Sequence, residues 1–511
     1  MNLAALADRN LSEFGEYERL IFDGRSLTNR ELHERSCNLA GGLRDLGLGP
    51  GDRVASVMPN SPEVLVIYPA VWRAGMTIVP ILPLLESQEL QCILENSTAR
   101  AVITSPEVYP KVSAAVRRLA VRPLVIVTGA AGAPADAISF EDVLVRGASA
   151  GAGANVVHRD GGDIATILYT SGTTGRPKGV LQTHDNLHAN AMNHWNSAIH
   201  HVGERTLLVL PLAHTFGLSV LISGYLLATR SVLMRSFDPG GALALIERHR
   251  VEYMVGVPTM FAYLLMHPSA GRYDTSSMKR WLVGAAPMPV EQIRAFERKF
   301  GGRVHVGYGL SEACPTLAND REGMPRKPGA AGVPLDGVRI RIVDDGGREL
   351  PPGGIGEICA QGANISPGYY ENPEATAEAF RDGWLFTGDI GYLDEDGYLF
   401  LVDRKKDLII RSGLNVYPKD VEEVIRRHPA VVDAAVVGVP DAKMGEDVCA
   451  YVVAREESTV SAEEIIAHCR AHLATYKTPR HVGFVPVLPK TALGKIRKTE
   501  LRRMAECAFR E

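Results

Sequence analysis

Short apolar segments alternate with helix-like segments over the first three-fifths of this 511-residue chain, and that rhythm constrains the fold more than any other feature. Apolar strands separated by helices are typical of a parallel sheet that is covered on both faces. The sequence therefore predicts an α/β fold whose large N-terminal part holds two parallel α/β subdomains. The strand-like segments are 54–57, 101–104, 124–128, 206–210, 232–234, 253–257, 281–283 and 304–306.

Capping residues and prolines place several helices. Residues 26–32 predict a capped helix start, and Ser61 is predicted to cap the next helix. The most apolar stretch, 63–85, is interrupted by Arg73 and three prolines, so a buried helix followed by a strand explains it better than a membrane span. The Ala- and Gly-rich stretch 129–162 is expected to be a long surface connection with one short helix.

The texture of the sequence changes near Gly332. Short strands and tight turns follow, which predicts a β-rich antiparallel subdomain over about 332–404. A charged stretch at 403–407 separates this subdomain from a final α+β unit.

Composition limits the class of protein. A chain of 511 residues is too long for one core, so two to four domains or subdomains are expected. A net charge of −4 gives no excess of positive charge that would indicate binding to nucleic acid or to an anionic membrane surface. The seven cysteines form no C-x-x-C pair, and the N-terminus has no signal-peptide pattern, so we expect a cytoplasmic protein.

One loop carries most of the chemical information. A β-prone run at 164–169 leads into Thr170-Ser-Gly-Thr-Thr-Gly-Arg-Pro-Lys178, which combines glycines, hydroxyls and two cations. Glycine lets backbone N–H groups approach a polyanion closely, and the hydroxyls and cations add donors and charge. This composition predicts a loop for nucleotide phosphates, although the spacing differs from a Walker A motif.

Six further segments make the resemblance specific. Together with the loop, they resemble the acyl-adenylate-forming (AMP-binding) superfamily, which includes acyl-CoA synthetases, luciferases and the adenylation domains of peptide synthetases. The motifs follow the family's order and are 169–179 (YTSGTTGRPKG), 284–287 (GAAP), 307–312 (GYGLSE), 384–389 (WLFTGD), 403–409 (DRKKDLI), 412–418 (SGLNVYP) and 489–496 (PKTALGKI).

The resemblance implies a two-step reaction. A carboxylate is a poor acyl donor because its leaving group would be oxide. Attack on the α-phosphate of ATP converts that oxygen into AMP, and a thiol, that of CoA, then displaces AMP. Negative charge gathers around the triphosphate, so catalysis depends mainly on positioning and charge neutralisation. The implied small molecules are ATP, Mg²⁺, CoA and a carboxylic acid.

The resemblance also implies residue roles on the ATP side. The loop would hold the β- and γ-phosphates, and Glu312 would ligate Mg²⁺. Ser311, where most relatives carry Thr, would meet the α-phosphate, and His214 would shape or gate the pocket near the substrate carboxylate. The loop residues are Thr170, Ser171, Gly172, Thr173, Thr174, Gly175 and Lys178, and the adenine site comprises Gly284, Ala285, Ala286, Tyr308 and Gly309.

The remaining roles belong to the C-terminal part. By resemblance, residues 1–404 form the adenylation domain and residues 407–511 a small mobile domain, with a hinge at about 403–407. Asp389 and Arg404 would bind the ribose, and Lys406 would be the hinge position. Gly413 would line the pantetheine tunnel, and Lys495 would bridge the substrate carboxylate and the α-phosphate.

The acid itself is less constrained. The segments that line the pocket in relatives read 212–218, 257–261, 283–286 and 306–307 here, and they are apolar or small except for His214, Thr215 and Thr259. No Asp is present in 212–218 for an α-ammonium group, and Gly307 stands where malonate-activating relatives carry Arg. A medium- or long-chain fatty acid is therefore expected, with room provided by small residues at 284, 285, 307 and 309.

The sequence is also compatible with other functions. An aryl or cinnamate-type acid is the next choice, and the acceptor could be the phosphopantetheine of an acyl carrier protein rather than CoA. A luciferase-like oxygenase is compatible with the nucleotide motifs. A non-catalytic scaffold of the same fold is disfavoured, because Lys178, Glu312, Asp389, Arg404 and Lys495 are all intact.

Overall fold

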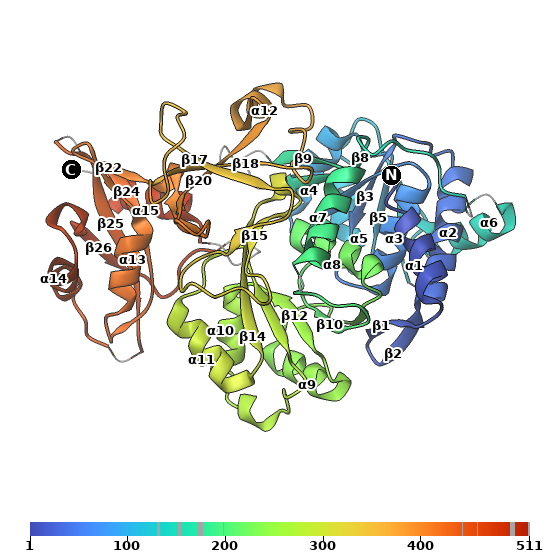
Figure 1. Cartoon of the computed structure of the whole chain (residues 1–511). Helices are drawn as coiled ribbons and strands as arrows, with labels where there is room; N and C mark the ends of the chain where they lie inside the picture. The colour runs from blue at the N-terminus through green and yellow to red at the C-terminus, as the bar shows by residue number, and fades with distance from the viewer. Residues whose placement is uncertain are drawn as a thin grey trace. The chain divides into compact units, whose positions relative to one another are not determined.

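The computed structural model describes residues 1–129, 133–151, 153, 155–170, 177–197, 199–441, 443–456, 458–490 and 496–508 (Figure 1). The chain divides into two compact units. Unit 1 comprises residues 1–340 and 360–386, and unit 2 comprises residues 341–359 and 387–511.

The first sheet of unit 1 is parallel except at one edge. Among the described residues it has seven strands in the order β7-β6-β5-β3-β4-β8-β9, and only β8 and β9 pair antiparallel. The strands are β3 (Arg53–Val57), β4 (Thr77–Ile81), β5 (Ala101–Thr104), β6 (Leu124–Val127), β7 (Ile138–Ser139), β8 (Ile164–Thr170) and β9 (Lys178–Thr183).

The second sheet of unit 1 is parallel in its centre and antiparallel at both ends. Its order in the described chain is β16-β15-β14-β13-β12-β10-β11-β1-β2. The strands are β1 (Glu18–Phe22), β2 (Arg25–Thr28), β10 (Arg205–Leu208), β11 (Arg230–Leu233), β12 (Tyr253–Gly256), β13 (Arg280–Val283), β14 (Arg303–Gly309), β15 (Thr316–Asn319) and β16 (Val333–Pro334).

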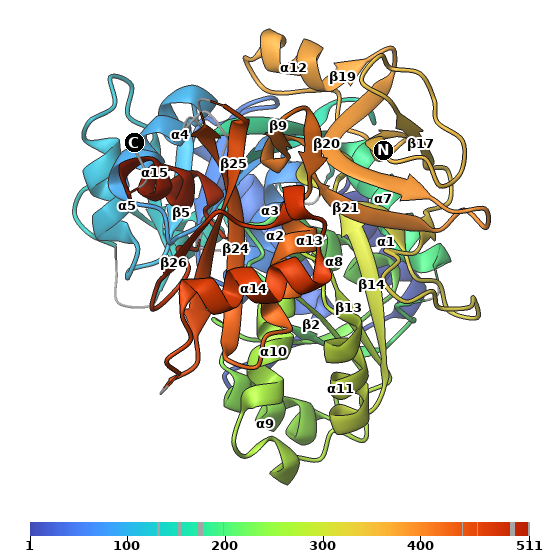
Figure 2. The same cartoon turned by 90° about the vertical axis from the view of Figure 1, so that its left-hand side faces the viewer.

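Helices cover both faces of both sheets, so unit 1 has five layers. A core shared by the two sheets encloses the middle layer, which contains α3 (Pro62–Arg73), α7 (His184–Asn196) and α8 (Thr215–Leu226). The outer face of the first sheet packs on α4 (Ser87–Ser97) and α5 (Tyr109–Val116). The outer face of the second packs on α9 (Pro239–His249), α10 (Pro258–Met266) and α11 (Val290–Phe300), as Figures 1 and 2 show.

The predicted α/β alternation is confirmed, because each predicted strand segment contains a strand of the structure. Residues 26–32 do contain a helix start: Thr28 and Glu31 form a capping box at α2 (Asn29–Asp45). Ser61 does stand at the N-cap of α3, but its hydroxyl makes no capping hydrogen bond, so that part of the prediction is wrong.

The stretch 129–162 is more than a surface connection. It contributes β7 to the first sheet and forms α6 (Phe140–Ala150), which packs directly on α2. A Cβ at Gly147 would lie 1.7 Å from the carbonyl oxygen of Asn38, so glycine lets the two backbones meet. The remaining N-terminal helix, α1 (Ala5–Phe14), packs against α8.

After Gly332 the chain forms short strands joined by turns, as the sequence predicts. The strand order there is β17-β18-β20-β19, with β21 paired to β20. The elements are β17 (Arg339–Val343), β18 (Gly356–Gln361), α12 (Pro373–Ala379), β19 (Phe380–Arg381), β20 (Trp384–Leu393) and β21 (Leu399–Arg404).

The C-terminal part of unit 2 is the predicted α+β unit. Two helices, α13 and α14, cover one face of its sheet, and α15 covers the other (Figure 2). The strand order in the described residues is β23-β22-β25-β24, with β26 paired to β25. The elements are β22 (Ile409–Arg411), β23 (Leu414–Val416), α13 (Pro418–Arg426), β24 (Val431–Asp441), β25 (Gly445–Ala454), α14 (Ala462–His472), β26 (His481–Phe484) and α15 (Lys498–Ala508).

Candidate functional site

The Thr- and Gly-rich loop connects the two strands of a hairpin. Thr170 ends β8, Lys178 begins β9, and the two residues are directly opposite each other in the antiparallel pair. The first sheet therefore fixes both ends of the loop. The predicted phosphate-binding residues Ser171, Gly172, Thr173, Thr174 and Gly175 lie outside the described residues.

A segment about 190 residues further along the sequence is bound to this hairpin. The N–H of Leu181 on β9 donates to the carbonyl of Gly368 at 3.0 Å, and the N–H of Tyr370 donates to the carbonyl of Gly179 at 2.7 Å. The Oγ of Ser366 donates to the carbonyl of Leu181 at 2.6 Å. Residues 366–370 thus extend the hairpin edge.

The same segment is also bound to the turn that carries Glu312. The amide Nδ2 of Asn364 donates to the carbonyls of Ala313 and Thr316, each at 2.9 Å. The N–H of Ser366 donates to the carbonyl of Glu312 at 2.8 Å. Backbone bonds therefore hold the β8–β9 hairpin and the Glu312 turn at a fixed separation, with one segment between them.

Tyr369 connects the two predicted site residues. Its hydroxyl donates to Glu312 Oε1 at 2.7 Å, and the Nζ of Lys178 lies 5.2 Å from the centre of its ring. Burial and the charge of Glu312 raise the pKa of the Tyr369 hydroxyl well above its ordinary value, which keeps it protonated as a donor. All three side chains are half-buried.

The predicted adenine residues lie at one edge of the second sheet. Gly284, Ala285 and Ala286 follow β13, and Tyr308 lies near the end of the neighbouring parallel strand β14. The carboxyl ends of parallel strands are where α/β sheets bind ligands. Tyr308 is buried, and Ala285 adopts a left-handed φ of 68°, so the chain turns sharply there.

A buried glutamine connects Ser311 with Thr215, the residue that follows His214. The Nε2 of Gln182 on β9 donates to the carbonyl of Ser311 at 3.0 Å and to the hydroxyl of Thr215 at 3.2 Å. His214 is the N-cap of α8, where its Nδ1 accepts from the N–H of Phe216 at 3.3 Å. Helix capping is thus one function of this histidine in the fold.

Two of the small residues predicted to leave room for the acyl group, Gly284 and Gly309, do not do so. A Cβ at Gly284 would lie 3.0 Å from the ring of Phe216, so that ring already fills the space. A Cβ at Gly309 would lie 2.0 Å from the carbonyl oxygen of Pro315, so this glycine allows a close backbone approach. At Gly307 the nearest atom would be Leu282 Cδ1 at 3.6 Å, an ordinary contact.

The two residues predicted to bind the ribose lie together within unit 2. Asp389 and Arg404 are opposite each other on the paired strands β20 and β21, and Arg404 Nε lies 3.3 Å from Asp389 Oδ1. The Asp389 side chain is 14% exposed and that of Arg404 is 48% exposed, so the carboxylate is the more enclosed partner.

The proposed hinge and tunnel residues are exposed. The carbonyl of Lys406 accepts from Arg502 Nη2 of α15 at 3.1 Å, and the same nitrogen donates to Asp407 Oδ1 at 2.8 Å. Gly413, with a φ of 78°, follows Ser412 in the two-residue turn of the hairpin formed by β22 and β23. Lys495 lies outside the described residues.

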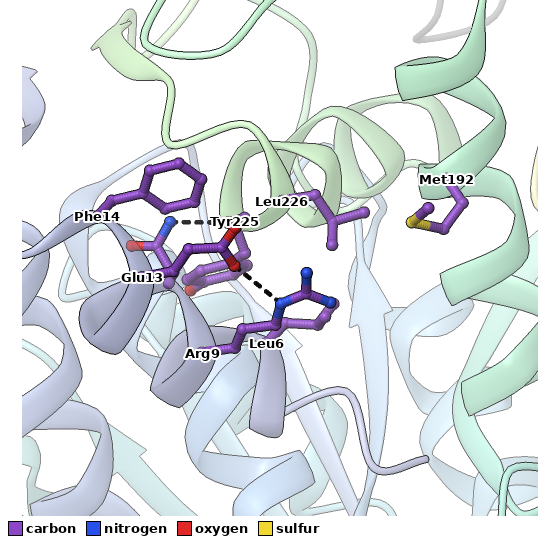
Figure 3. Close-up of a pocket in the computed structure, with 8 residues that line it drawn as sticks. Leu6, Arg9, Glu13, Phe14, Met192, Tyr225 and Leu226 are labelled. Carbon is purple, nitrogen blue, oxygen red and sulfur yellow. Dashed lines mark hydrogen bonds and ion pairs between the residues drawn. The ribbon is translucent and has the colours of Figure 1, made fainter.

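A separate cavity lies where α1 packs against the C-terminal end of α8 (Figure 3). Its volume is about 80 Å³, and its walls include Leu6, Phe14 and Leu226. The polar groups there have partners: Asn10 Nδ2 donates to the carbonyl of Tyr225 at 2.7 Å, and Arg9 pairs with Glu13. His214 stands at the opposite end of the 12-residue helix α8, so the cavity is a packing gap remote from the site.

Family models match most of the chain. The model for the AMP-binding enzyme matches residues 7–370, and the model for the AMP-binding enzyme C-terminal domain matches residues 420–495. The chain belongs to the AMP-binding enzyme family. The resemblance inferred from the seven motifs is therefore confirmed.

Curated relatives of this AMP-binding enzyme match along almost the whole chain. A long-chain-fatty-acid–CoA ligase from Bacillus subtilis (strain 168) is 35% identical over 530 residues, covering 98% of this chain and 94% of the relative. A feruloyl-CoA synthase from Amycolatopsis sp is 39% identical over 483 residues, covering 94% of each chain.

Solved structures match the fold over the whole chain. ATP-bound MatB from Rhodopseudomonas palustris has a TM-score of 0.90 and 33% identity, covering 100% of each chain. The anthranilate CoA ligase AuaEII in complex with anthranoyl-AMP has a TM-score of 0.92 and 28% identity, covering 100% of this chain and 98% of the other.

These similarities fix the reaction class. The AMP-binding enzyme described here is an AMP-forming acyl-CoA synthetase, an acid–thiol ligase that uses ATP and CoA. Among its described helices, none is long and apolar enough to cross a membrane.

Sequence reasoning missed two side chains of the site, Tyr369 and Gln182. Gln182 comes directly after the apolar residues Val180 and Leu181 and belongs to no recognisable motif. Tyr369 is one of two adjacent tyrosines after a Pro-Gly pair. The Pro-Gly pair predicts a turn, but nothing in it indicates that the turn lies against Glu312. Only the tertiary contacts reveal either residue.

Proposed function

We propose that this acyl-CoA synthetase activates an apolar carboxylic acid, with a medium- or long-chain fatty acid as the first choice. The observation that carries the proposal is the absence of Asp, Glu, Lys and Arg from the sequence segments 212–218, 257–261, 283–286 and 306–307. A charged second group on the acid would be costly to bury without a partner. The 35% identity to a long-chain-fatty-acid–CoA ligase supports the choice.

We propose the following roles for the site residues of unit 1. Lys178 is the first residue of β9. Together with the preceding loop, it would neutralise the charge of the β- and γ-phosphates. Glu312 fits a hard cation because it offers carboxylate oxygens, and one of them already has its orientation fixed by Tyr369. Bound there, Mg²⁺ would supply charge neutralisation for the triphosphate. Tyr308 and residues 284–286 would enclose the adenine, and Ser311 would donate to the α-phosphate.

The roles in unit 2 complete the proposal. The Asp389 carboxylate would accept hydrogen bonds from the ribose hydroxyls, with Arg404 holding it in place at 3.3 Å. We also propose that residues 407–511 pivot at about 403–407. Lys495 would then serve adenylation, and the Gly413 turn would serve transfer to CoA.

A substrate screen tests the proposed acid. Pyrophosphate release is measured with saturated medium- and long-chain acids, cinnamic acids and benzoic acids, each with and without CoA. We expect the highest kcat/KM for the fatty acids, and acyl-CoA formation only when CoA is present. Turnover confined to aryl acids, or to a holo-carrier protein as acceptor, would contradict the proposal.

A second candidate, a cinnamate-type acid with a polar ring substituent, is favoured by Asn319. This residue is fully buried on β15 opposite Gly307, and neither its Nδ2 nor its Oδ1 has a hydrogen-bond partner in the described part of the chain. An unpaired buried amide is costly, so a hydroxyl of the acid could satisfy it. The feruloyl-CoA synthase at 39% identity supports this candidate.

The Asn319→Leu variant separates the two candidates. If the amide binds a ring hydroxyl, kcat/KM for a hydroxylated cinnamic acid falls about tenfold, while that for unsubstituted cinnamic acid is unchanged. An equal change for both acids would show that Asn319 has only a structural role.

A further inference from the structure

The Tyr369 side chain lies between two opposite charges. Glu312 accepts a hydrogen bond from one end of it at 2.7 Å, and Lys178 lies over its ring at 5.2 Å. In the described residues, Lys178 and Glu312 form no ion pair with each other. An aromatic ring with a hydroxyl can engage both at once, because its face attracts a cation and its O–H donates to a carboxylate.

The position of Tyr369 is fixed from several directions. Its N–H donates to Thr376 Oγ1 at 2.9 Å, and that hydroxyl donates to the carbonyl of Asn372 at 2.8 Å. Its backbone forms a bridge with Val180 of β9, and its ring packs edge-on against Phe380 with centroids 5.9 Å apart. Contacts with β9 and α12 therefore hold the backbone of Tyr369, and Phe380 of β19 packs against its ring.

We propose that Tyr369 is a positioning residue that keeps Lys178 and Glu312 apart and orients Glu312 toward the cation bound with ATP. The inference rests on the proposed role of Glu312 as the Mg²⁺ ligand. Without a spacer, a lysine and a glutamate on facing elements would pair and neutralise each other in the empty site. With the spacer, each charge stays available for a different part of the ligand: Lys178 for phosphate oxygens and Glu312 for the metal ion.

The hydroxyl and the ring have separable functions. The hydroxyl fixes the rotation of the Glu312 carboxylate by holding Oε1, which suits a cation that demands strict geometry. The ring holds the lysine away from Glu312. Removal of the hydroxyl should therefore affect metal binding, and removal of the whole ring should also affect binding of the nucleotide without metal.

Direct binding measurements test the first function. The probe is Mn²⁺, titrated in the presence of an unreactive ATP analogue, with free Mn²⁺ followed by electron paramagnetic resonance. For Tyr369→Phe we expect the Kd of Mn²⁺ to rise about tenfold, the effect of losing one hydrogen bond to a charged group. The matched control is Tyr370→Phe, which removes the hydroxyl of the adjacent tyrosine and should change the Kd less than twofold.

A second variant tests the function of the ring. For Tyr369→Leu we expect the metal-free Kd of the ATP analogue to rise at least threefold above that of Tyr369→Phe, since Lys178 then pairs with Glu312. Far-UV circular dichroism and the melting temperature establish that each variant is folded. Equal metal-free nucleotide affinity for the two variants would overturn the spacer function.

A third variant distinguishes failure of this inference from failure of the proposed function. Glu312→Gln should weaken Mn²⁺ binding more than Tyr369→Phe does. If Glu312→Gln has no effect, Glu312 is not the ligand and the proposed site is wrong. If Glu312→Gln abolishes binding and Tyr369→Phe leaves it unchanged, only the positioning role of Tyr369 is wrong.

Discussion

The site region of unit 1 and the site region of unit 2 are built differently. Around Tyr369, segments that are far apart in sequence are joined by backbone hydrogen bonds, and the side chains are buried or half-buried. In unit 2, Asp389 and Arg404 meet across one hairpin, and Gly413 lies in the turn of another. Arg404, Lys406 and Gly413 are exposed.

This difference fits the roles that we propose for the two regions. A triphosphate needs its charges met by groups that are already in position, because reorganisation of dipoles during the reaction costs rate. The unit 2 residues that we propose for adenylation and for CoA transfer need a local structure that stays the same when the C-terminal domain pivots. Hairpins provide such a structure, since their geometry depends on a few neighbouring residues. The following four predictions test this contrast.

The largest effect is expected for Lys495→Ala. Loss of one oriented donor should reduce acyl-AMP formation by about 10²–10³-fold, while thioester formation from supplied acyl-AMP is largely kept. The measurement is pyrophosphate exchange compared with CoA consumption. The control is Lys490→Ala, which removes the same charge from a position five residues earlier in the same sequence motif. An equal loss in both half-reactions would refute the role.

A smaller effect, about 100-fold, is expected on CoA transfer for Gly413→Leu, with pyrophosphate exchange intact. Apart from the two chain neighbours, the described part of the protein has no atom within 4 Å of a Cβ at this exposed position, so the side chain itself, rather than internal packing, would obstruct the thiol. Because the φ of 78° also disfavours leucine, Gly413→Asn is the control: asparagine tolerates this φ and is smaller. Retained CoA transfer in the leucine variant counts against the assignment.

Acid should destabilise unit 1 through its buried histidines. Burial lowers the pKa of His305 to about 3 and that of His184 to about 4, below the ordinary value of 6.5. Below pH 6.5 the unfolded chain binds protons that the folded chain excludes, so stability is complete above this pH and is lost as the pH falls. Each histidine should contribute about 1.4 kcal/mol per pH unit between pH 6 and pH 5.

Urea unfolding followed by tryptophan fluorescence measures this effect, because all four tryptophans (72, 195, 281 and 384) belong to unit 1. The His305→Gln variant should show a shallower pH dependence, and the same change at the exposed His472 of unit 2 should leave it unaltered. An unchanged slope for His305→Gln would mean that its protonation does not limit the stability of unit 1.

The smallest effect is expected for Asp389→Asn. Loss of the charged acceptor should raise the KM for ATP about tenfold with little change in kcat, since ribose contacts are made equally in the ground and transition states. Asp396→Asn, in the turn of the same hairpin, is the control. A fall in kcat with unchanged KM would place Asp389 in the chemistry rather than in binding.

Much of the fold could be predicted because its signals are local. The apolar strands, the Thr28 capping box and the change near Gly332 each depend on fewer than a dozen consecutive residues. The sequence did not show that β1 and β2 join the second sheet beside β11, because that pairing joins residues about 200 positions apart. It also did not show that α6 packs on α2 through glycine contacts.

The candidate site divides in the same way. The motifs indicated the groups that we propose for phosphate and metal binding, including Lys178 and Glu312, because such binding requires particular residue types at short spacings. Tyr369 could not be found in this way, since it is 57 residues from Glu312 and has no motif of its own. The sequence predicted room for the acyl group at Gly284 and Gly309. The structure shows that Phe216 and Pro315 occupy that room.

The sequence by itself determined the α/β class and the reaction class, and it indicated most of the groups that we propose to bind the substrates. These properties depend on residue type and short-range order, which the chain carries wherever it folds. The tertiary structure alone decided which side chain separates Lys178 from Glu312 and how much room the glycines leave. Those outcomes depend on long-range backbone pairing, whose energy is shared among residues that no local pattern connects.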